Sequence, residues 1–227
     1  MKIVCISDTH TFHNEIVIPD GDILIHAGDF TIAGEIWEIA AFNEWLGTLP
    51  HKHKIVIAGN HDWLFQKNPT LARSLITNAI YLEDSMTEIE GLKIYGSPWQ
   101  PWFMDWAFNL PRGHALAEKW ALIPEGIDIL VTHSPPMGVL DKTRASDRAG
   151  CSELTGAVLK IKPRLHIFGH IHEGYGKVEI DYTRFINAST CDAAYRAINK
   201  PLVVELEPEA SALSGDSEVE PASVVST

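Results

Sequence analysis

Five short runs of apolar and β-branched residues recur along the chain, and each leads directly into residues that can bind a metal. Their length and composition are typical of buried strands. Sites in open α/β sheets form outside the carboxyl ends of strands, so such ends can share one site. The pattern predicts one site built from distant segments. The runs span residues 2–7, 22–28, 54–59, 128–133 and 165–170, and they lead to Asp8, His10, Asp29, Asn60, His133, His170 and His172.

Helical patterns lie between several of these runs, and two other stretches indicate antiparallel strands. A Glu-Gly break in SMTEIEGLKIYGS predicts a β-hairpin, and GKVEIDYTRFINAS with the later PLVVELE suggests antiparallel strands late in the chain. Strands that alternate with helices and end in a β-rich return indicate a mixed α/β fold. Helices are expected within residues 34–49, 70–76, 113–122 and 152–160.

The composition limits the cellular setting and the classes of partner. A length of 227 residues suits one domain or at most two small ones, and 45% hydrophobic residues suffice for a sizeable core. No apolar stretch of membrane-spanning length occurs, and the N-terminus lacks the pattern of a signal peptide. Three cysteines without a C-x-x-C pair make a disulfide framework unexpected. We therefore expect a cytoplasmic protein without a membrane partner.

The last twenty residues differ from the rest of the chain in composition. Residues 208–227 contain four acids and no base, are rich in serine, and carry few large apolar groups. They are expected to be a disordered tail that follows a single domain over residues 1–207. The net charge of −12 then leaves 18 − 26 = −8 on that domain. An acidic surface repels phosphate backbones, so stable nucleic-acid binding is not expected.

The polar residues at the strand ends form a recurring set of short motifs. Each motif alone is weak evidence, because an aspartate after a strand commonly caps a turn or helix. Together and in this order they resemble the calcineurin-like metallophosphoesterase family, and SPWQPWFMDWAFN and GHIHEGYG…FINAST resemble its narrower group of brain-expressed metallophosphodiesterases. The motifs are DTH (8–10), GD (28–29), GNHD (59–62), THSPP (132–136) and GHIH (169–172).

The resemblance implies a four-layer α/β/β/α sandwich of two mixed sheets flanked by helices, with two metal ions at the strand ends. Gly169 would allow the turn that directs His170 and His172 to different metals. The mixture of carboxylate, amide and imidazole ligands favours Mn²⁺, with Fe or Zn as alternatives. One metal would take Asp8, His10, Asp29 and His172, and the other would take Asn60, His133, His170 and the shared Asp29.

The chemistry implied by this centre is hydrolysis of a phosphoester. A hydroxide that bridges the metals would attack phosphorus, and His61 would protonate the leaving group. Asp62 either orients His61 or caps a helix. His26, inside a strand, is either a partner of a ligand or a core residue.

Contacts to the substrate are expected from four residues. Asn60, Trp99, Trp102 and Arg148 are the candidates. The tryptophan-rich segment that also holds Trp106 either stacks a nucleobase or forms a hydrophobic plug. Arg148 either contacts phosphate or is a solvated surface charge.

Several functions are compatible with a complete set of ligands. The leading hypothesis is a phosphodiesterase that hydrolyses small phosphodiesters such as cyclic nucleotides, the substrate class being implied by the resemblance. A phosphomonoesterase or protein phosphatase is an alternative, and the acidic domain argues against a nuclease. A regulatory module that binds metal and nucleotide without turnover is a third possibility, and a structural domain with an incidental metal is a fourth. The number of associated chains stays open.

Overall fold

Two β-sheets stacked face to face form the centre of the computed structural model, which describes residues 1–207. The first sheet has the order β13-β1-β2-β3-β4 and the second β11-β12-β10-β9-β6-β5. In the first, β13 is antiparallel to β1 and the other pairs are parallel. In the second, the outer strands β5 and β11 are antiparallel to their neighbours. Both sheets are therefore mixed, and the expected fold class is confirmed.

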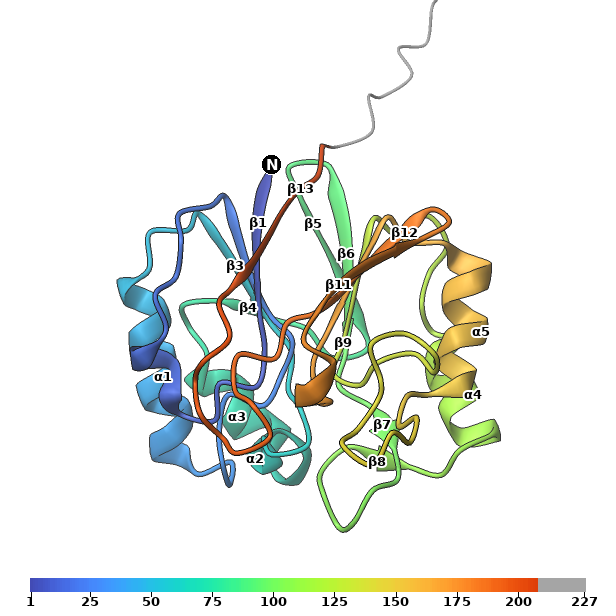
Figure 1. The fold of residues 1–227 in the computed structure, drawn as a ribbon. Coiled ribbons are helices and arrows are strands. Elements are labelled where there is room, and N and C mark those ends of the chain that lie inside the picture. Colours follow the sequence, from blue (N-terminus) through green and yellow to red (C-terminus); the bar gives the residue numbers. More distant parts are fainter. Residues whose placement is uncertain (208–227) are drawn as a thin grey trace, which may run out of the picture.

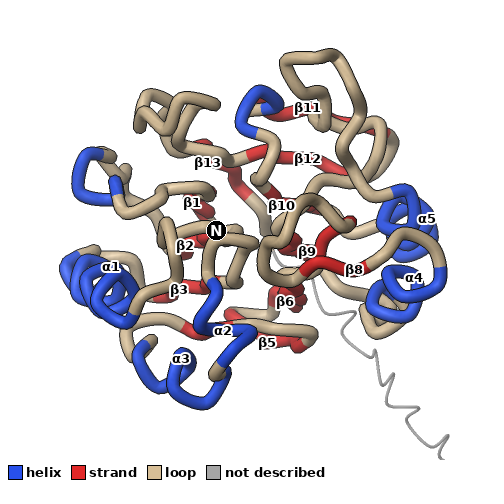
Figure 2. Tube along the Cα trace, turned by 90° about the horizontal axis from the view of Figure 1, so that it is seen from below, coloured by secondary structure: helices blue, strands red, loops and turns tan. Residues whose placement is uncertain are grey.

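Helices cover the outer face of each sheet and complete four layers (Figure 1). Seen from below, α1 and α3 lie on one side of the two sheets and α4 and α5 on the other (Figure 2). The helices are α1 (Ile36–Thr48), α2 (Trp63–Lys67), α3 (Pro69–Leu75), α4 (His114–Trp120) and α5 (Ser152–Ile161), with 3-10 turns at Phe12–Glu15 and His172–Gly174. The strands are β1 (Lys2–Ile6), β2 (Ile23–His26), β3 (His53–Val56), β4 (Ile80–Tyr81), β5 (Ser85–Ile89), β6 (Leu92–Ser97), β7 (Gln100–Pro101), β8 (Asn109–Leu110), β9 (Ile129–Thr132), β10 (Leu165–Phe168), β11 (Gly176–Ile180), β12 (Thr183–Asn187) and β13 (Leu202–Glu205).

The alternation of side chains along the strands explains why the sheets stack. Ile3 and Cys5 of β1 pack into the core between the sheets, whereas Val4 and Ile6 face the helical layer beside α1. In the second sheet, Leu130 of β9 packs in the core that includes residues of α4 and α5. Strands buried on both faces read as continuous apolar runs, and that is the form in which they occur in the sequence.

The expected elements are present, and some short ones were not expected. The late strands are antiparallel as expected, β11 with β12 in the second sheet and β13 with β1 in the first. The short helix α2, the strand β4 and the pair β7–β8 were not expected, because segments of two to five residues carry too little periodicity. The predicted tail 208–227 lies outside the described residues. Within residues 1–207, no helix combines the length and apolarity that crossing a membrane requires.

His13 is a buried imidazole that no motif of the sequence singles out. It packs against Phe42 and Trp45 of α1, and neither ring nitrogen has a hydrogen-bond partner among the described residues. Burial lowers the pKa of His13 to about 4, below its unfolded value of 6.5. Between these pH values the unfolded chain binds more protons, so His13 reduces stability increasingly as the pH falls from 6.5 towards 4.

Replacing His13 by leucine is therefore expected to make the free energy of unfolding fall less steeply as the pH is lowered. Urea unfolding in EDTA between pH 7.5 and 4.5 measures the proton uptake that accompanies unfolding. The variant should take up roughly one proton fewer than the wild type near pH 5. His114→Leu, at an exposed histidine, is the control. An unchanged slope in His13→Leu would contradict the burial argument.

Candidate metal centre

The carboxyl ends of five strands from both sheets meet at one end of the molecule. The loops after β1, β2 and β3 supply residues from the first sheet, and those after β9 and β10 supply residues from the second. Within each of three groups, the possible ligand atoms lie within 4.8 Å of one another. The groups are Asp8 with His10 and His172, Asp29 with His133 and His170, and His10 with Asp29 and His61. Asp29 thus lies close to ligands of both proposed metals.

Left-handed backbone at four of these positions directs the side chains into the cluster. The φ angles are 52° at Asp8, 41° at His10, 59° at Asp29 and 67° at His170. Non-glycine residues adopt this region rarely, and such strain concentrates at functional sites. The turn expected at Gly169 is present, since Ile171 N donates to Gly169 O at 2.7 Å, but its left-handed residue is His170. Gly169 instead provides space beside Asp8.

Among the four imidazoles proposed as metal ligands, three have a tautomer fixed by backbone carbonyl groups. A carbonyl oxygen only accepts hydrogen bonds, so each Nδ1 that contacts one must carry a proton. In a neutral ring the Nε2 atom then presents a lone pair to the cluster, as in histidines that bind metals. The Nδ1 contacts are His10 to Thr31 O at 3.2 Å, His133 to Ala27 O at 2.9 Å, and His172 to Asp192 O at 2.9 Å.

The Nε2 atoms of these rings face one another or face oxygen acceptors. His10 Nε2 lies 3.4 Å from His172 Nε2. His133 Nε2 lies 2.9 Å from Asn60 Oδ1 and 3.3 Å from Asp29 Oδ2. In neutral rings these lone pairs would repel one another, so the cluster needs either protons or a bound cation between them. The donor set of two carboxylates, one amide oxygen and four imidazoles therefore fits transition-metal ions.

The charges of the buried groups also indicate that the cluster needs positive charge. Burial opposes ionisation of Asp8 and Asp29, but His172 holds the pKa of Asp8 well below its usual range, and His133 does so for Asp29. Burial would lower the pKa of His133 and His172, yet Asp29 and Asp8 respectively raise both values to about 9. Without a cation, two protonated imidazoles balance the two carboxylates. Bound metal ions would replace those protons.

His61 and Asp62 have separate roles in the loop after β3. The Nδ1 atom of His61 lies 2.7 Å from the carbonyl oxygen of Ile32, which fixes the ring. Within residues 1–207, no hydrogen bond joins Asp62 to that ring, and Asp62 makes no capping bond to α2. Both expected roles of Asp62 are therefore wrong. Its carboxylate accepts hydrogen bonds from the N–H groups of Asp29, Gly59 and Thr31 at 2.7–3.0 Å and from Thr31 Oγ1 at 2.7 Å, and so joins two ligand loops.

His26 and Ser189 form hydrogen bonds that support the loops carrying Asp8 and Asp29. The N–H of Gly28 donates to His26 Nδ1 at 3.2 Å, and His26 Nε2 lies 3.0 Å from Thr9 Oγ1. His26 is thus a fully buried residue that also links the first two ligand loops. Ser189 Oγ donates to Asp8 Oδ2 at 2.8 Å. The sequence contained no separate signal for Ser189, because the contact joins residues 181 positions apart.

The candidate ligands border a cavity of about 300 Å³. Asp29, Asn60, His61, His170 and His172 line it. Aromatic residues outside the predicted site also line it, among them Trp106, whose ring centroid lies 4.1 Å from that of His61, and Tyr195, whose ring centroid lies 4.7 Å from that of His10. Trp106 was expected only as one member of the tryptophan-rich segment, and Tyr195 was not expected at all.

The four residues expected to contact the substrate lie in different parts of the structure. Asn60 lines the cavity, and Trp102 lines a neighbouring cavity that also contains His170. Trp99 lies elsewhere, since its indole N–H donates to Asp84 at 3.0 Å and Lys119 covers its ring. Arg148 pairs with the buried Asp141 at 2.8 Å. Neither Trp99 nor Arg148 lines either cavity, so both have structural contacts in place of the expected ones.

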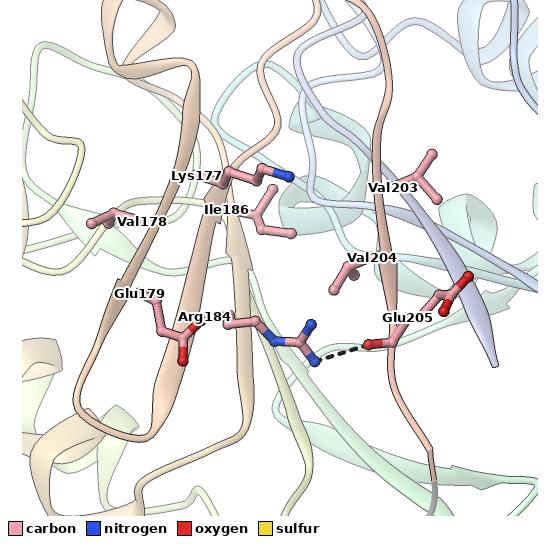
Figure 3. Close-up of a pocket in the computed structure, with 8 residues that line it drawn as sticks. All are labelled: Lys177, Val178, Glu179, Arg184, Ile186, Val203, Val204 and Glu205. Carbon is pink, nitrogen blue, oxygen red and sulfur yellow. Dashed lines mark hydrogen bonds between the residues drawn. The ribbon is translucent and has the colours of Figure 1, made fainter.

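A wider groove runs along the seam between β13 and the hairpin β11–β12 (Figure 3). Its polar lining consists of Lys177, Glu179, Arg184 and Glu205, and Arg184 donates to the carbonyl oxygen of Glu205 at 2.9 Å. Glu205 pairs with Lys2 at the amino end of β1, and Glu179 pairs with Arg184 near the amino end of β12. The groove therefore lies away from the ligand loops and contains no candidate ligand.

Gly169 permits a close approach that no other residue allows. A Cβ atom at this position would lie 2.0 Å from Asp8 Oδ2 and 2.2 Å from Ser7 Oγ. Gly169→Ala is therefore expected to displace Asp8 and to weaken metal binding by at least about tenfold, measured by titration with Mn²⁺. Gly156→Ala, in α5 with nothing within 4 Å of the added Cβ, is the control and should raise stability by roughly 0.5–1 kcal/mol. Equal Mn²⁺ affinity in wild type and Gly169→Ala would refute the packing argument.

Two stacked sheets with an aspartate and histidine cluster at their strand ends define a metallophosphoesterase type of hydrolase. The family model for calcineurin-like phosphoesterases matches residues 1–174, and the chain belongs to this family. Its members bind a dinuclear metal centre, in agreement with the clustered aspartates and histidines.

Individual relatives and solved structures agree with this assignment. The human Metallophosphoesterase domain-containing protein 1 is 50% identical over 230 residues, which cover 90% of this chain and 71% of that protein. The UPF0046 protein C25E10.12 of Caenorhabditis elegans is 42% identical over 91% of this chain and 81% of its own length. The structure of TT1561 from Thermus thermophilus has a TM-score of 0.54 at 15% identity, covering 82% of this chain and 88% of that chain, and so supports the fold alone.

Proposed function

We propose that this phosphoester hydrolase is a phosphodiesterase with a dinuclear centre that acts on small phosphodiesters such as cyclic nucleotides. The observation that carries the proposal is the position of Asp29, which lies within ligand distance of both histidine groups while His61 borders the same cavity. Asp29 would bridge two ions, Mn²⁺ by preference and Fe or Zn as alternatives. Asp8, His10 and His172 would complete one site, and Asn60, His133 and His170 the other.

Each protein group has a defined task in this hydrolysis. When bound, the two cations would supply an activated water as the nucleophile and would offset the charge on the phosphoryl oxygens. The water oxygen forms the new bond to phosphorus as the bond from phosphorus to the leaving oxygen breaks. A doubly protonated His61, whose Nδ1–H is held by the carbonyl oxygen of Ile32, would give its Nε2 proton to that leaving oxygen. Asp62 and Ser189 keep the ligand loops and Asp8 in place.

The lining of the cavity supports a diester over a monoester. Among the described residues that line it there is neither lysine nor arginine, whereas the carboxylate of Glu173 is present. A phosphodiester carries one negative charge, whereas a monoester carries nearly two at neutral pH, so the monoester would need additional cationic contacts. The acidic domain, with a net charge of −8 from 18 basic and 26 acidic residues, supports a small substrate over a nucleic acid.

The proposal is tested with protein reconstituted separately with Mn²⁺, Fe²⁺ and Zn²⁺. Substrates are bis(p-nitrophenyl) phosphate, p-nitrophenyl phosphate, and 2′,3′- and 3′,5′-cyclic nucleotides. We expect kcat/KM for the diester to exceed that for the monoester by at least about tenfold, corresponding to one disfavoured charge contact. A preference for the monoester would indicate a phosphatase. Absence of turnover with all three metals would favour the binding module.

We also propose a reducing compartment, in keeping with the expected cytoplasmic location. Cys5, Cys151 and Cys191 are all buried, and none forms a disulfide. Burial raises the pKa of Cys151 to about 11 and that of Cys191 to about 12, so these thiols stay protonated and poorly reactive at neutral pH.

A further inference from the structure

Tyr195 borders the metal-facing cavity and has no role in the hydrolysis described so far. It lines the cavity together with Asp29 and His61. Its ring lies edge-on to the rings of His10 and His172, with centroid distances of 4.7 Å and 5.7 Å. The ring centroid of His61 lies 6.1 Å away. Tyr195 is therefore beside two proposed ligands of one metal and close to the proposed proton donor.

The hydroxyl group of Tyr195 is available to a ligand. Within residues 1–207 it forms no hydrogen bond, whereas the hydroxyl of Tyr81 donates to Glu83 at 2.7 Å. The residue is 43% exposed, so a molecule in the cavity can reach its side chain. A phenol has a pKa of about 10 and keeps its proton at neutral pH, so it can donate a hydrogen bond.

The backbone at Tyr195 adopts an unfavourable conformation that neighbouring groups maintain. Its φ angle is 57°, a left-handed value that bulky residues rarely adopt and that is commonest at functional sites. The carboxylate of Asp192 accepts hydrogen bonds from Ala194 N at 2.9 Å and Arg196 N at 3.0 Å, and it also pairs with the guanidinium of Arg196. These contacts close a tight turn that holds the Tyr195 ring over the histidines.

One carbonyl oxygen connects this turn to the metal centre. Asp192 O accepts hydrogen bonds from His172 Nδ1 at 2.9 Å and from Tyr195 N at 2.8 Å. A carbonyl oxygen has two lone pairs and can accept both bonds. The base of the loop is closed by a bond from Asn199 N to Thr190 O at 3.0 Å. The group that fixes the tautomer of His172 therefore also fixes the position of Tyr195.

The charges around the cavity favour a neutral donor at this position. Among the described residues that line it there is no lysine or arginine. Hydrogen-bond donors that are already in place stabilise the charge that develops on phosphoryl oxygens during the reaction. A phenol supplies such a donor without adding a positive charge, which suits a diester with a single negative charge.

We propose that Tyr195 contacts the substrate and donates its phenol hydrogen to a non-bridging phosphoryl oxygen of the diester. This inference rests on the proposed function and adds a substrate contact to it. His61 acts on the leaving oxygen, so the two residues serve different oxygens of the same phosphorus. The bond from Tyr195 strengthens as negative charge increases on the non-bridging oxygen.

The test uses two diesters that differ in their leaving group, methyl p-nitrophenyl phosphate and methyl phenyl phosphate. Tyr195→Phe removes only the hydroxyl and should lower kcat/KM by about 10- to 100-fold, the usual effect of losing a hydrogen bond to a charged group. The factor should be the same for both esters, and the metal content should not change. Tyr182→Phe, at a tyrosine that is 78% exposed between β11 and β12, is the matched control and should behave as wild type.

A further variant, Tyr195→Leu, distinguishes the hydroxyl from the ring. Normal kcat/KM in Tyr195→Phe with a loss only in Tyr195→Leu would mean that the ring merely covers the centre, and would overturn the proposal. A larger loss on methyl phenyl phosphate than on the nitrophenyl ester would place the hydroxyl at the leaving oxygen, and would also overturn it.

A binding measurement separates this contact from the proposed function. If the wild type hydrolyses neither ester, the proposed function is contradicted, and calorimetric titration of the Mn²⁺-loaded protein with dimethyl phosphate decides about Tyr195. Weaker binding in Tyr195→Phe than in Tyr182→Phe supports the contact. Equal binding in the two variants, or no binding to the wild type, overturns it.

Discussion

Asp29→Ala is expected to lose bound metal and to lower phosphodiester hydrolysis by at least about a thousandfold, since the stabilisation of charge at phosphorus would be lost. Asp29 lies with His10 and His61 on one side and with His133 and His170 on the other, within 4.8 Å in each group. Without its carboxylate, neither proposed site keeps its full set of ligands. Elemental analysis of protein purified with excess Mn²⁺ should find less than one ion per chain.

A second substitution at Asp29 separates charge from packing. Asp29→Asn retains an oxygen that can accept the hydrogen bond from His61 N, which is 2.7 Å long in the wild type, but lacks the negative charge. It should fold normally and still bind metal weakly. Asp20→Ala, at an exposed aspartate outside the centre, is the control and should retain two ions. Full metal content in Asp29→Ala would exclude Asp29 as the bridge.

His61→Ala is expected to keep the metals and to slow esters with poor leaving groups by about 10²–10⁴-fold, the usual range for a lost general acid. An alkoxide needs a proton as it departs, whereas p-nitrophenolate leaves readily without one. Hydrolysis of an alkyl diester should therefore fall far more than that of bis(p-nitrophenyl) phosphate. The comparison requires both rates and the metal content of each preparation.

The leaving-group dependence makes the assignment of His61 specific. A side chain that only shapes the cavity, for example through the ring contact with Trp106, would slow both esters alike. His114→Ala, at an exposed histidine of α4, serves as the control for loss of an imidazole. Equal losses on the two esters, or loss of metal in His61→Ala, would rule out His61 as the proton donor.

The sequence predicted the mixed α/β class and the grouping of polar residues because both follow from short-range patterns, whereas the four layers were implied by the family resemblance. Apolar runs define buried strands, and the residue after each strand necessarily lies at the carboxyl edge of its sheet. Asp8, Asp29 and His133 are therefore close together in the structure although they are far apart along the chain. Their assignment to two particular metal ions stays a prediction.

Features that depend on contacts between distant side chains were not predictable in this way. The bond from Ser189 to Asp8 and the packing of Tyr195 on His10 depend on how a late loop folds back over the centre. Trp99 and Trp102 are three positions apart in the same aromatic segment, yet one is anchored by Asp84 and the other lines a cavity. Composition cannot distinguish them, because the difference depends on the path of the loop.

The division of the strand ends between two sheets has a consequence for how the protein is assembled during synthesis. The first 62 residues contain Asp8, His10, Asp29 and Asn60, but the remaining histidines arrive only when residues 133–172 have been made and docked. A metal ion bound by the complete set of ligands would link the early half of the chain to the late half. Metal supply would then govern how long the finished molecule persists as well as its catalytic competence.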